Sequence, residues 1–319
     1  MKAVVIGAAG HIGTYLTPML VKGGFETVAI TRSMSKPYED DPAWSSAERV
    51  LLDRDNDPDF IEKLKAMQPD IIVDLVNFNV AETKKIVEAF KNSSLSHYLY
   101  CSSCWAHGMA ETVPFDPDAL RKEPLDDYGK DKFASEMYLK EQYRQNGFPA
   151  TIIMPGQISG AGWTIINPWG NTSMRVFQDI ADGKEICLPN FGQEILHHVH
   201  GYDVAQVFYQ AITHRNQALG ESFDAEAATH ITLYGFAKHM YEYFGHEPKI
   251  KFLPWPEWCE YEGNPEECDH TYYHIARSGV FSIEKAKRLL EYQPKYTCLE
   301  TIDLAVKSYI DRRLIEVKK

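Results

Sequence analysis

The sequence predicts an α/β fold with a doubly wound parallel sheet, and three observations support this class. Six short apolar runs occur in the first 155 residues, separated by segments with helical periodicity. This alternation favours parallel strands joined by right-handed crossover connections. A glycine-rich turn follows the first run directly, and a tyrosine and a lysine four residues apart fall on a later helix. After residue 155 the alternation stops, which predicts a smaller C-terminal lobe beside the sheet.

The composition is that of an ordinary globular protein. The 319 residues are 44% hydrophobic and 24% charged, with a formal net charge of −12. These values exclude disordered, collagen-like and coiled-coil proteins as the overall class. The acidic balance argues against nucleic-acid binding through general surface charge, because phosphate neutralisation dominates such affinity. The apolar runs are too short to span a bilayer, so we expect neither a nucleic-acid nor a membrane partner.

The cysteine content and the first residues favour a reducing compartment. Six cysteines in a chain of this length do not form a disulfide framework, and no apolar stretch of signal-peptide length precedes the first predicted strand. We therefore expect a cytoplasmic location. Cys101 and Cys104 are interpreted as buried thiols, because no second pair lies nearby. Two groups of potential ligands lack a recognised metal spacing, so no metal is expected: His197, His198 and His200, and Cys268, His270 and His274.

The first 155 residues contain six predicted strands, at residues 3–6, 27–31, 50–52, 71–76, 98–100 and 151–154. Their near-continuous apolar character fits a sheet that is covered on both faces. The helix after the first strand ends at Gly23 and Gly24, and the helix before the sixth extends from about Tyr128 to Gly147.

The second half of the chain is predicted from caps and apolar spacing. Residues 156–171 are rich in glycine, asparagine and tryptophan and favour a loop, and residues 252–274 show little periodicity. Helices are predicted near residues 174–180, from an N-cap at Asp203, from Thr232 to Gly245, after Ser282 and after Leu299.

A glycine-rich loop joins the first strand to the first helix, with glycines at Gly7, Gly10 and Gly13. This spacing lets the backbone turn sharply and approach a pyrophosphate, whose charge a helix N-terminus favours. In its strand–loop–helix context the motif predicts dinucleotide binding. The second strand leads to Arg32 instead of the carboxylate expected for NAD, and a guanidinium suits a 2′-phosphate, which favours NADP. A solvated surface arginine is the alternative. Asp53 either meets the adenine edge or is an ordinary turn residue.

Tyr128 and Lys132 lie on one face of a predicted helix, and Ser102 and Ser103 close the fifth strand at the sheet edge where such folds bind ligands. A free tyrosine has a pKa of about 10 and is a poor base at neutral pH. A nearby ammonium and an oxidised nicotinamide favour the phenolate. Ser103 can then hydrogen-bond the substrate oxygen, and Lys132 can also hold the nicotinamide ribose.

At these residues the chain resembles the short-chain dehydrogenase/reductase superfamily, and within it the extended NAD-dependent epimerase/dehydratase family. The resemblance covers nearly the whole chain, through the glycine loop, Asp53, Ser102-Ser103 with Gly108, Tyr128 with Lys132, Pro155-Gly156, His200 with Asp203, and a C-terminal signature at residues 285–295. It implies a Rossmann domain in which Tyr128 is the general acid/base, Lys132 its electrostatic partner and Ser103 the donor to the substrate oxygen. It also implies a homodimer formed through helices beside the fourth and fifth strands.

The motifs and the resemblance together give two sets of site residues. Cofactor contacts are expected from Gly7, Gly10, His11, Ile12, Gly13, Arg32, Asp53, Ser102, Tyr128, Lys132, Pro155, Gly156 and Ile158. Substrate contacts are expected from Ser103, His107, Gln157, Trp163, Asn167, Arg175 and His200.

The chain departs from the family pattern at two positions where nucleotide-sugar epimerases bind the substrate diphosphate through arginines. The two family arginines are replaced by Leu196 and Thr271, although Arg277 lies near. Loss of these bidentate contacts favours a smaller polyhydroxylated substrate. Its wall is predicted from Trp163, Asn167, Trp169, Asn171 and Arg175, with simple packing of the lobe as the alternative.

We therefore predict an NAD(P)-dependent oxidoreductase or epimerase that acts on a hydroxyl or carbonyl carbon of a sugar-like substrate. Residues 1–155 would form the dinucleotide-binding domain, to which residues 196–226 return, and residues 156–195 and 227–319 the substrate-binding lobe. The rival is a catalytically silent dinucleotide-sensing or RNA-binding protein, because residues 70–77 and the segment before His200 resemble plastid RNA-binding relatives. The complete Ser103, Tyr128 and Lys132 set favours the enzyme.

Overall fold

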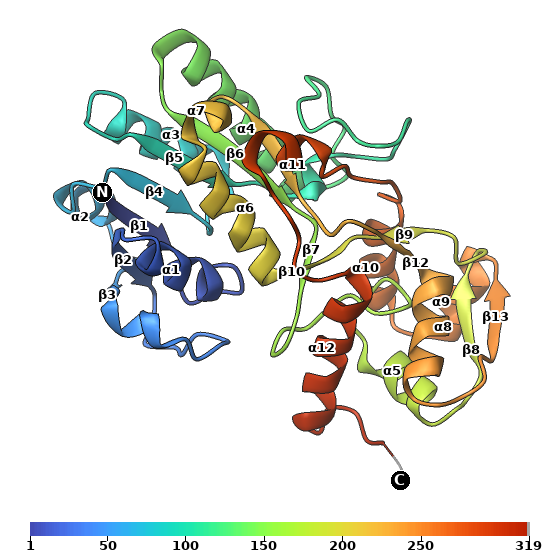
Figure 1. Ribbon diagram of the computed structural model, residues 1–319. Coiled ribbons are helices and arrows are strands. Elements are labelled where there is room, and N and C mark those ends of the chain that lie inside the picture. The colour runs from blue at the N-terminus through green and yellow to red at the C-terminus, as the bar shows by residue number, and fades with distance from the viewer. Residues whose placement is uncertain (318–319) are drawn as a thin grey trace.

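The computed structural model describes residues 1–317 and contains a seven-stranded parallel sheet in the order β11-β6-β5-β4-β1-β2-β3 (Figure 1). This confirms the predicted doubly wound class. The strands are β1 (Lys2–Ile6), β2 (Glu26–Thr31), β3 (Glu48–Leu51), β4 (Ile71–Asp74), β5 (His97–Cys101), β6 (Ala150–Pro155) and β11 (Ser222–Ala225). Strand β11 comes from the segment expected to return to the first domain, and it pairs with β6.

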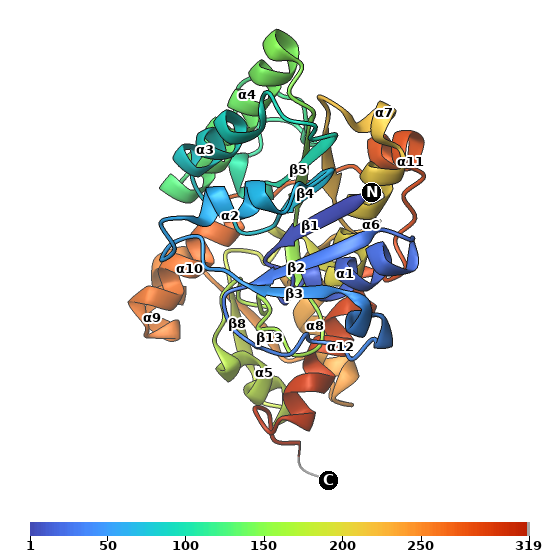
Figure 2. The same ribbon diagram turned by 90° about the vertical axis from the view of Figure 1, so that its left-hand side faces the viewer.

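Helices cover both faces of this sheet, as Figure 2 shows. One face carries α1 (Gly13–Lys22), α6 (Gly201–Thr213), α7 (Arg215–Ala218) and α11 (Glu284–Leu290). The other carries α2 (Phe60–Ala66), α3 (Val80–Phe90) and α4 (Asp127–Asn146). Alternate residues of β1 enter the two cores, Ala3 and Val5 on the α1 side and Val4 and Ile6 on the α3 side, because successive strand side chains point to opposite faces.

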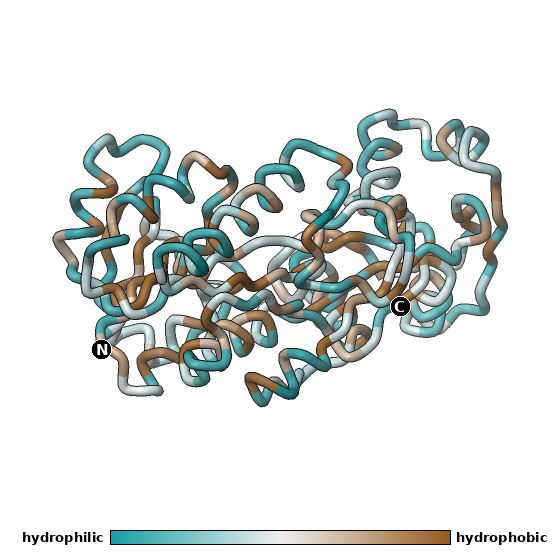
Figure 3. The backbone as a smooth tube through the Cα atoms, turned by 90° about the horizontal axis from the view of Figure 1, so that it is seen from above, coloured by the Kyte–Doolittle hydropathy of each residue, from teal (hydrophilic) through white to brown (hydrophobic). Residues whose placement is uncertain are grey.

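The second lobe lies beyond the carboxyl ends of the sheet strands (Figure 1). Its helices are α5 (Met174–Ala181), α8 (Leu233–Tyr243), α9 (Trp255–Glu262), α10 (Pro265–Ile275) and α12 (Cys298–Asp311). Three strand pairs accompany them: β7 (Gln157–Ser159) with β10 (His198–His200), β8 (Ile186–Pro189) with β13 (Ile250–Leu253), and β9 (Ile195–Leu196) with β12 (Ile231–Thr232). The two parts lie side by side, with hydrophobic residues along the central strands (Figure 3).

In the second half of the chain, a segment for which no element was predicted is helical, and one predicted N-cap was wrong. Residues 252–274 form the end of β13 and the helices α9 and α10, because Asn264 caps α10 and Trp258 is fully buried, although mixed aromatic and polar residues obscure the period. Asp203 is not an N-cap. The cap of α6 is His200, whose Nδ1 accepts from the Tyr202 N–H, while the Asp203 carboxylate accepts from two backbone N–H groups further along the chain.

Other local expectations were confirmed. Thr232 caps α8 by accepting a hydrogen bond from the Gly235 N–H at 3.0 Å, and the chain turns at Gly245 with a φ of 76°. None of the helices within residues 1–317 combines the length and the apolar character needed to cross a bilayer.

Candidate functional site

A cavity of about 470 Å³ lies at the carboxyl ends of β1, β2 and β3. Its walls come from the glycine loop, the ends of β2 and β3 and one residue of the second lobe. The lining includes Gly7, Gly10, Arg32, Tyr38, Asp53, Phe78 and Trp163. A parallel sheet of this class binds ligands at this edge, where the strand order reverses.

The backbone of the glycine loop has no room for side chains. Gly7 has a φ of 87°, and a Cβ there would lie 2.7 Å from Val76 Cγ1; a Cβ on Gly13 would lie 2.3 Å from the Ala8 carbonyl oxygen. Helix α1 begins at Gly13 after Ile12, and no side chain caps its N-terminus. The backbone N–H groups at the start of α1 are therefore left without side-chain partners. Because the glycine loop lets a ligand approach the backbone closely, these N–H groups can bind the pyrophosphate of a dinucleotide.

Arg32 and Asp53 line the opposite end of the cavity. Arg32 is exposed, and the Asp53 carboxylate accepts hydrogen bonds from Asn56 Nδ2 at 2.9 Å and the Asp55 N–H at 3.0 Å. The Asn56 bond, with help from Arg32, lowers the pKa of Asp53. Asp53 thus closes its own turn, and the exposed guanidinium of Arg32 lies near it.

The structure brings Tyr128, Lys132 and Ser103 together at the N-terminal end of α4. Asp126 caps this helix by accepting from the Gly129 N–H at 2.7 Å. Lys132 Nζ lies 5.4 Å from the centre of the Tyr128 ring, and the Ser103 hydroxyl hydrogen-bonds with the phenol. The three predicted residues therefore form one cluster.

Burial sets the proton affinities within this cluster. Desolvation raises the pKa of Tyr128 although the side chain is 38% exposed, and the hydrogen bond from Ser103 opposes this shift in part. Desolvation lowers the pKa of the buried Lys132. The protein groups alone therefore keep the phenol protonated at neutral pH.

Phe78 connects the cavity to this cluster. Its ring lines the cavity, lies 6.4 Å from the Tyr128 ring centre, and has the Lys132 ammonium 5.1 Å from its own centre. A ligand that extends along the glycine loop would reach Tyr128 past this side chain.

Several predicted cofactor residues lie outside the cavity wall. The Ser102 hydroxyl donates to Glu136, which pairs with the buried Lys122, so this side chain points toward α4. Pro155 ends β6, and Ile158 packs partly buried against the sheet core. Gly156 is a tight position, because a Cβ there would lie 2.1 Å from the Glu226 carboxylate.

Two residues of the predicted substrate wall have hydrogen-bond partners within the second lobe. Asn167 is fully buried, and its amide bonds to Asn171 and the Ser173 carbonyl within its own loop. Arg175 donates to the Glu262 carbonyl and lies over the Trp169 ring. These contacts are internal to the second lobe and support the packing alternative. Neither Asn167 nor Arg175 is kept in the proposed site.

The remaining predicted substrate residues also have protein partners. His107 is buried against Phe115 and Phe281, with ring centres at 4.7 and 5.5 Å. Gln157 Oε1 accepts from the His197 N–H at 2.9 Å, and His200 caps α6. Trp163 lines the dinucleotide cavity instead of a separate substrate wall. Among residues 1–317 no group of three or more potential ligands is arranged to hold a metal ion.

Two residues beside Tyr128 were missed as site residues. The Trp105 ring lies 6.0 Å from the Tyr128 ring, and the Arg277 guanidinium lies 3.9 Å from the Trp105 ring centre. Arg277 also pairs with Asp126 at 3.0 Å. Only the fold joins these segments, since 151 positions separate Arg277 from Asp126 in the chain.

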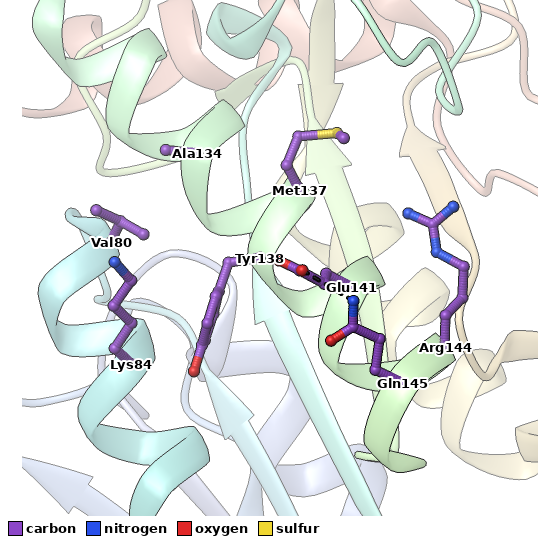
Figure 4. Close-up of a pocket in the computed structure, with 8 residues that line it drawn as sticks. All are labelled: Val80, Lys84, Ala134, Met137, Tyr138, Glu141, Arg144 and Gln145. Atoms are coloured by element: carbon purple, nitrogen blue, oxygen red, sulfur yellow. Dashed lines mark hydrogen bonds between the residues drawn. The ribbon is translucent and has the colours of Figure 1, made fainter.

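A second hollow lies between α3 and α4 (Figure 4). Figure 4 shows Lys84 of α3 beside the Tyr138 ring of α4, and Met137 directly precedes Tyr138 in the chain. These are the helices that flank β5, through which a dimer was expected.

Comparison with known proteins agrees with this geometry. Residues 3–225 match the NAD dependent epimerase/dehydratase family. The chloroplast stem-loop binding protein of 41 kDa b of Arabidopsis thaliana is 27% identical over 94% of this chain and 76% of its own length. UDP-glucose 4-epimerase of Streptococcus mutans is 19% identical over 95% of this chain and 94% of its own.

The solved UDP-glucuronic acid 4-epimerase of Bacillus cereus, in complex with NAD, covers 99% of this chain and 100% of its own with a TM-score of 0.73. At 18% identity this likeness shows the shared fold alone. The family match, however, spans the glycine loop, the Tyr128 cluster and the returning strand β11. The chain therefore belongs to the NAD-dependent epimerase/dehydratase family.

Proposed function

We propose that this protein is an NAD(P)-dependent oxidoreductase or epimerase that acts on a hydroxyl- or carbonyl-bearing carbon of a sugar-like substrate. The observation that carries the proposal is the Tyr128, Ser103 and Lys132 cluster beside a cavity with a phosphate-binding loop. Family membership supports the same assignment.

In this proposal the chain's own side chains hold the substrate and move its proton. A bound nicotinamide dinucleotide supplies the hydride acceptor when an alcohol is oxidised. Ser103 donates a hydrogen bond to the substrate oxygen, and the Tyr128 phenolate takes the hydroxyl proton as the carbonyl forms. The Lys132 ammonium favours the phenolate by charge, and in the reverse direction Tyr128 returns the proton.

The raised pKa of Tyr128 makes this chemistry depend on a second positive charge. Lys132 alone leaves the phenol protonated, because desolvation outweighs the neighbouring groups. An oxidised nicotinamide ring near the phenol would add such a charge. Proton transfer would then be coupled to the presence of the oxidised cofactor, and the apo-protein would lack a base.

We propose a substrate without a nucleoside diphosphate. Leu196 and Thr271, at the family's arginine positions, are both fully buried, and Thr271 bonds to Asn171. Neither can bind a diphosphate. Arg277, which lies near Thr271 in the sequence, is itself 3% exposed and paired with Asp126. Turnover of UDP-sugars and of free sugars and polyols, compared on one panel, tests this point.

The choice between NADP and NAD is a further proposal. Arg32 lines the cavity, where its guanidinium could bind a 2′-phosphate, so NADP is proposed over NAD, which the solved Bacillus cereus structure contains.

A homodimer through the hollow between α3 and α4 is also proposed. Sedimentation of the wild type and of Met137→Glu tests it, with a shift of the variant toward monomer expected.

The experiment that tests the enzyme itself is Tyr128→Phe. Loss of the proton donor is expected to lower turnover by about 10²–10⁴-fold while dinucleotide affinity stays within a few fold. Tyr143→Phe, further along the same helix and outside the hollow between α3 and α4, is the matched control and keeps full turnover. Undiminished activity of Tyr128→Phe would remove Tyr128 from proton transfer.

A second function is kept because one observation favours it. The Arabidopsis relative, matched over 94% of this chain, is named as a stem-loop binding protein. Salt-sensitive binding to a stem-loop RNA, with no turnover of any sugar or carbonyl compound, would favour the RNA-binding alternative.

A further inference from the structure

Three aromatic side chains from three separate segments meet beside the glycine loop. His11 stacks on Trp163 with ring centres 4.9 Å apart and planes at 9°. Tyr38 packs edge-on against both, at 5.3 Å from His11 and 5.6 Å from Trp163. We call His11, Tyr38 and Trp163 the aromatic cover.

Two of the three residues of the aromatic cover line the cavity. Tyr38 and Trp163 line the cavity of about 470 Å³ together with Gly7 and Gly10 of the glycine loop. His11 lies directly after Gly10 in that loop. Tyr38 and Trp163 therefore stand beside the loop that would hold a pyrophosphate, and the buried His11 ring stacks on Trp163.

Hydrogen bonds fix the backbone at Tyr38 and next to Trp163 to two helices. The Tyr38 N–H donates to Thr14 Oγ1 of α1 at 2.8 Å. On the other side, the Gly162 N–H donates to Ser308 Oγ of α12 at 2.9 Å. Gly162 has a φ of 82°, and a Cβ there would lie 3.0 Å from the Tyr38 ring, so the close approach needs a glycine. The aromatic cover thus packs Trp163 of the second lobe against residues beside the glycine loop.

His11 supplies a polar group that the protein leaves unpaired. Its side chain is 3% exposed, and neither ring nitrogen has a hydrogen-bond partner in the protein. A buried polar atom without a partner costs free energy, which a polar ligand recovers. Burial, with His200 nearby, lowers the pKa of His11 to about 3, so the ring would act as a neutral hydrogen-bonding group.

We propose that the aromatic cover is part of the dinucleotide site, that a His11 ring nitrogen hydrogen-bonds the bound pyrophosphate, and that Trp163 and Tyr38 retard cofactor release. This inference rests on the proposed function as a dinucleotide-dependent enzyme.

The first experiment measures release of NADH and NADPH, by displacement followed through nicotinamide fluorescence. Trp163→Ala is expected to release the dinucleotide at least tenfold faster than the wild type, and Trp163→Phe to stay within about threefold. Tyr234→Ala, an exposed ring of the second lobe, is the control. Melting curves of each variant check that the fold is kept. An unchanged release rate in a folded Trp163→Ala overturns the inference.

The second experiment separates pyrophosphate contact from ring packing. His11→Phe keeps an aromatic ring for stacking but removes both nitrogens. It is expected to weaken dinucleotide binding at least fivefold and to leave adenosine binding unchanged, because adenosine has no pyrophosphate. Equal dinucleotide affinity in His11→Phe and wild type contradicts the His11 contact. Failure of the wild type to bind either dinucleotide removes the proposed function, and the inference with it.

Discussion

Lys132 Nζ lies 5.4 Å from the Tyr128 ring centre and donates to the backbone carbonyls of Asn77 and Cys101, each at 2.7 Å. These carbonyls belong to the segments that follow β4 and end β5, so the sheet itself holds the ammonium in place. One turn of α4 places Tyr128 beside it. The pair is thus fixed by backbone groups and not by a flexible carboxylate partner.

Removing this ammonium should raise the pH at which the enzyme becomes active. Lys132→Met deletes the nearby positive charge, so formation of the phenolate requires a higher pH and turnover at neutral pH falls by about tenfold or more. The pH–rate profile measures the shift. Lys130→Met, which removes an exposed lysine of the same helix, should leave the profile in place. Coincident profiles for wild type and Lys132→Met would show that the ammonium does not tune Tyr128.

Filling the glycine loop should abolish dinucleotide binding. A Cβ on Gly13 would lie 2.3 Å from the Ala8 carbonyl oxygen, so Gly13→Ala must move the backbone that approaches the pyrophosphate. We expect the dinucleotide Kd to rise at least tenfold, measured by calorimetric titration. Gly235→Ala, where the nearest atom is the Thr232 hydroxyl at 3.2 Å, serves as the control. Unaltered affinity in Gly13→Ala would place the dinucleotide elsewhere.

Arg32 should decide between the two dinucleotides. Arg32→Ala removes a guanidinium from the cavity end and is expected to weaken NADP binding by about tenfold. NAD binding should change less than twofold, because NAD has no 2′-phosphate. Parallel titrations with both cofactors check this. If the variant loses equal affinity for both, Arg32 does not read the 2′-phosphate.

A buried acid at the end of β11 should make stability fall as pH rises. Burial raises the pKa of Asp224 to about 8, although the nearby Lys122 ammonium opposes this shift in part. Between its ordinary pKa of 3.8 and about 8 the folded state holds a proton that the unfolded state releases. The free energy of unfolding therefore declines through this window, by up to about 1.4 kcal/mol per pH unit.

Asp224→Asn removes that titration and should flatten the decline. Urea unfolding at pH 5 and at pH 8 measures it, and the variant should gain stability relative to wild type mainly at pH 8. Asp269→Asn, at an exposed position of α10, should show the wild-type dependence. An identical pH dependence in Asp224→Asn would mean that Asp224 does not titrate in this range.

The local patterns predicted the features that depend on neighbouring residues. The spacing of Gly7, Gly10 and Gly13, and of Tyr128 and Lys132, is short-range geometry of a loop and of one helical turn. Apolar runs likewise predicted the sheet, because buried parallel strands need continuous apolar side chains. Contacts across long separations could not be predicted in this way. Arg175 was placed in a substrate wall, yet it donates to the carbonyl of Glu262, a residue 87 positions away that only folding brings near.

The sequence by itself determined the class of the fold, the phosphate loop and the Tyr128–Lys132 pair, because each follows from spacing along one strand, loop or helix. Only the tertiary structure decided that Trp163 stacks on His11 and that the Arg277 guanidinium lies over the Trp105 ring. Each of these contacts joins segments more than 150 residues apart in the chain. They form because the second lobe packs against the edge of the sheet.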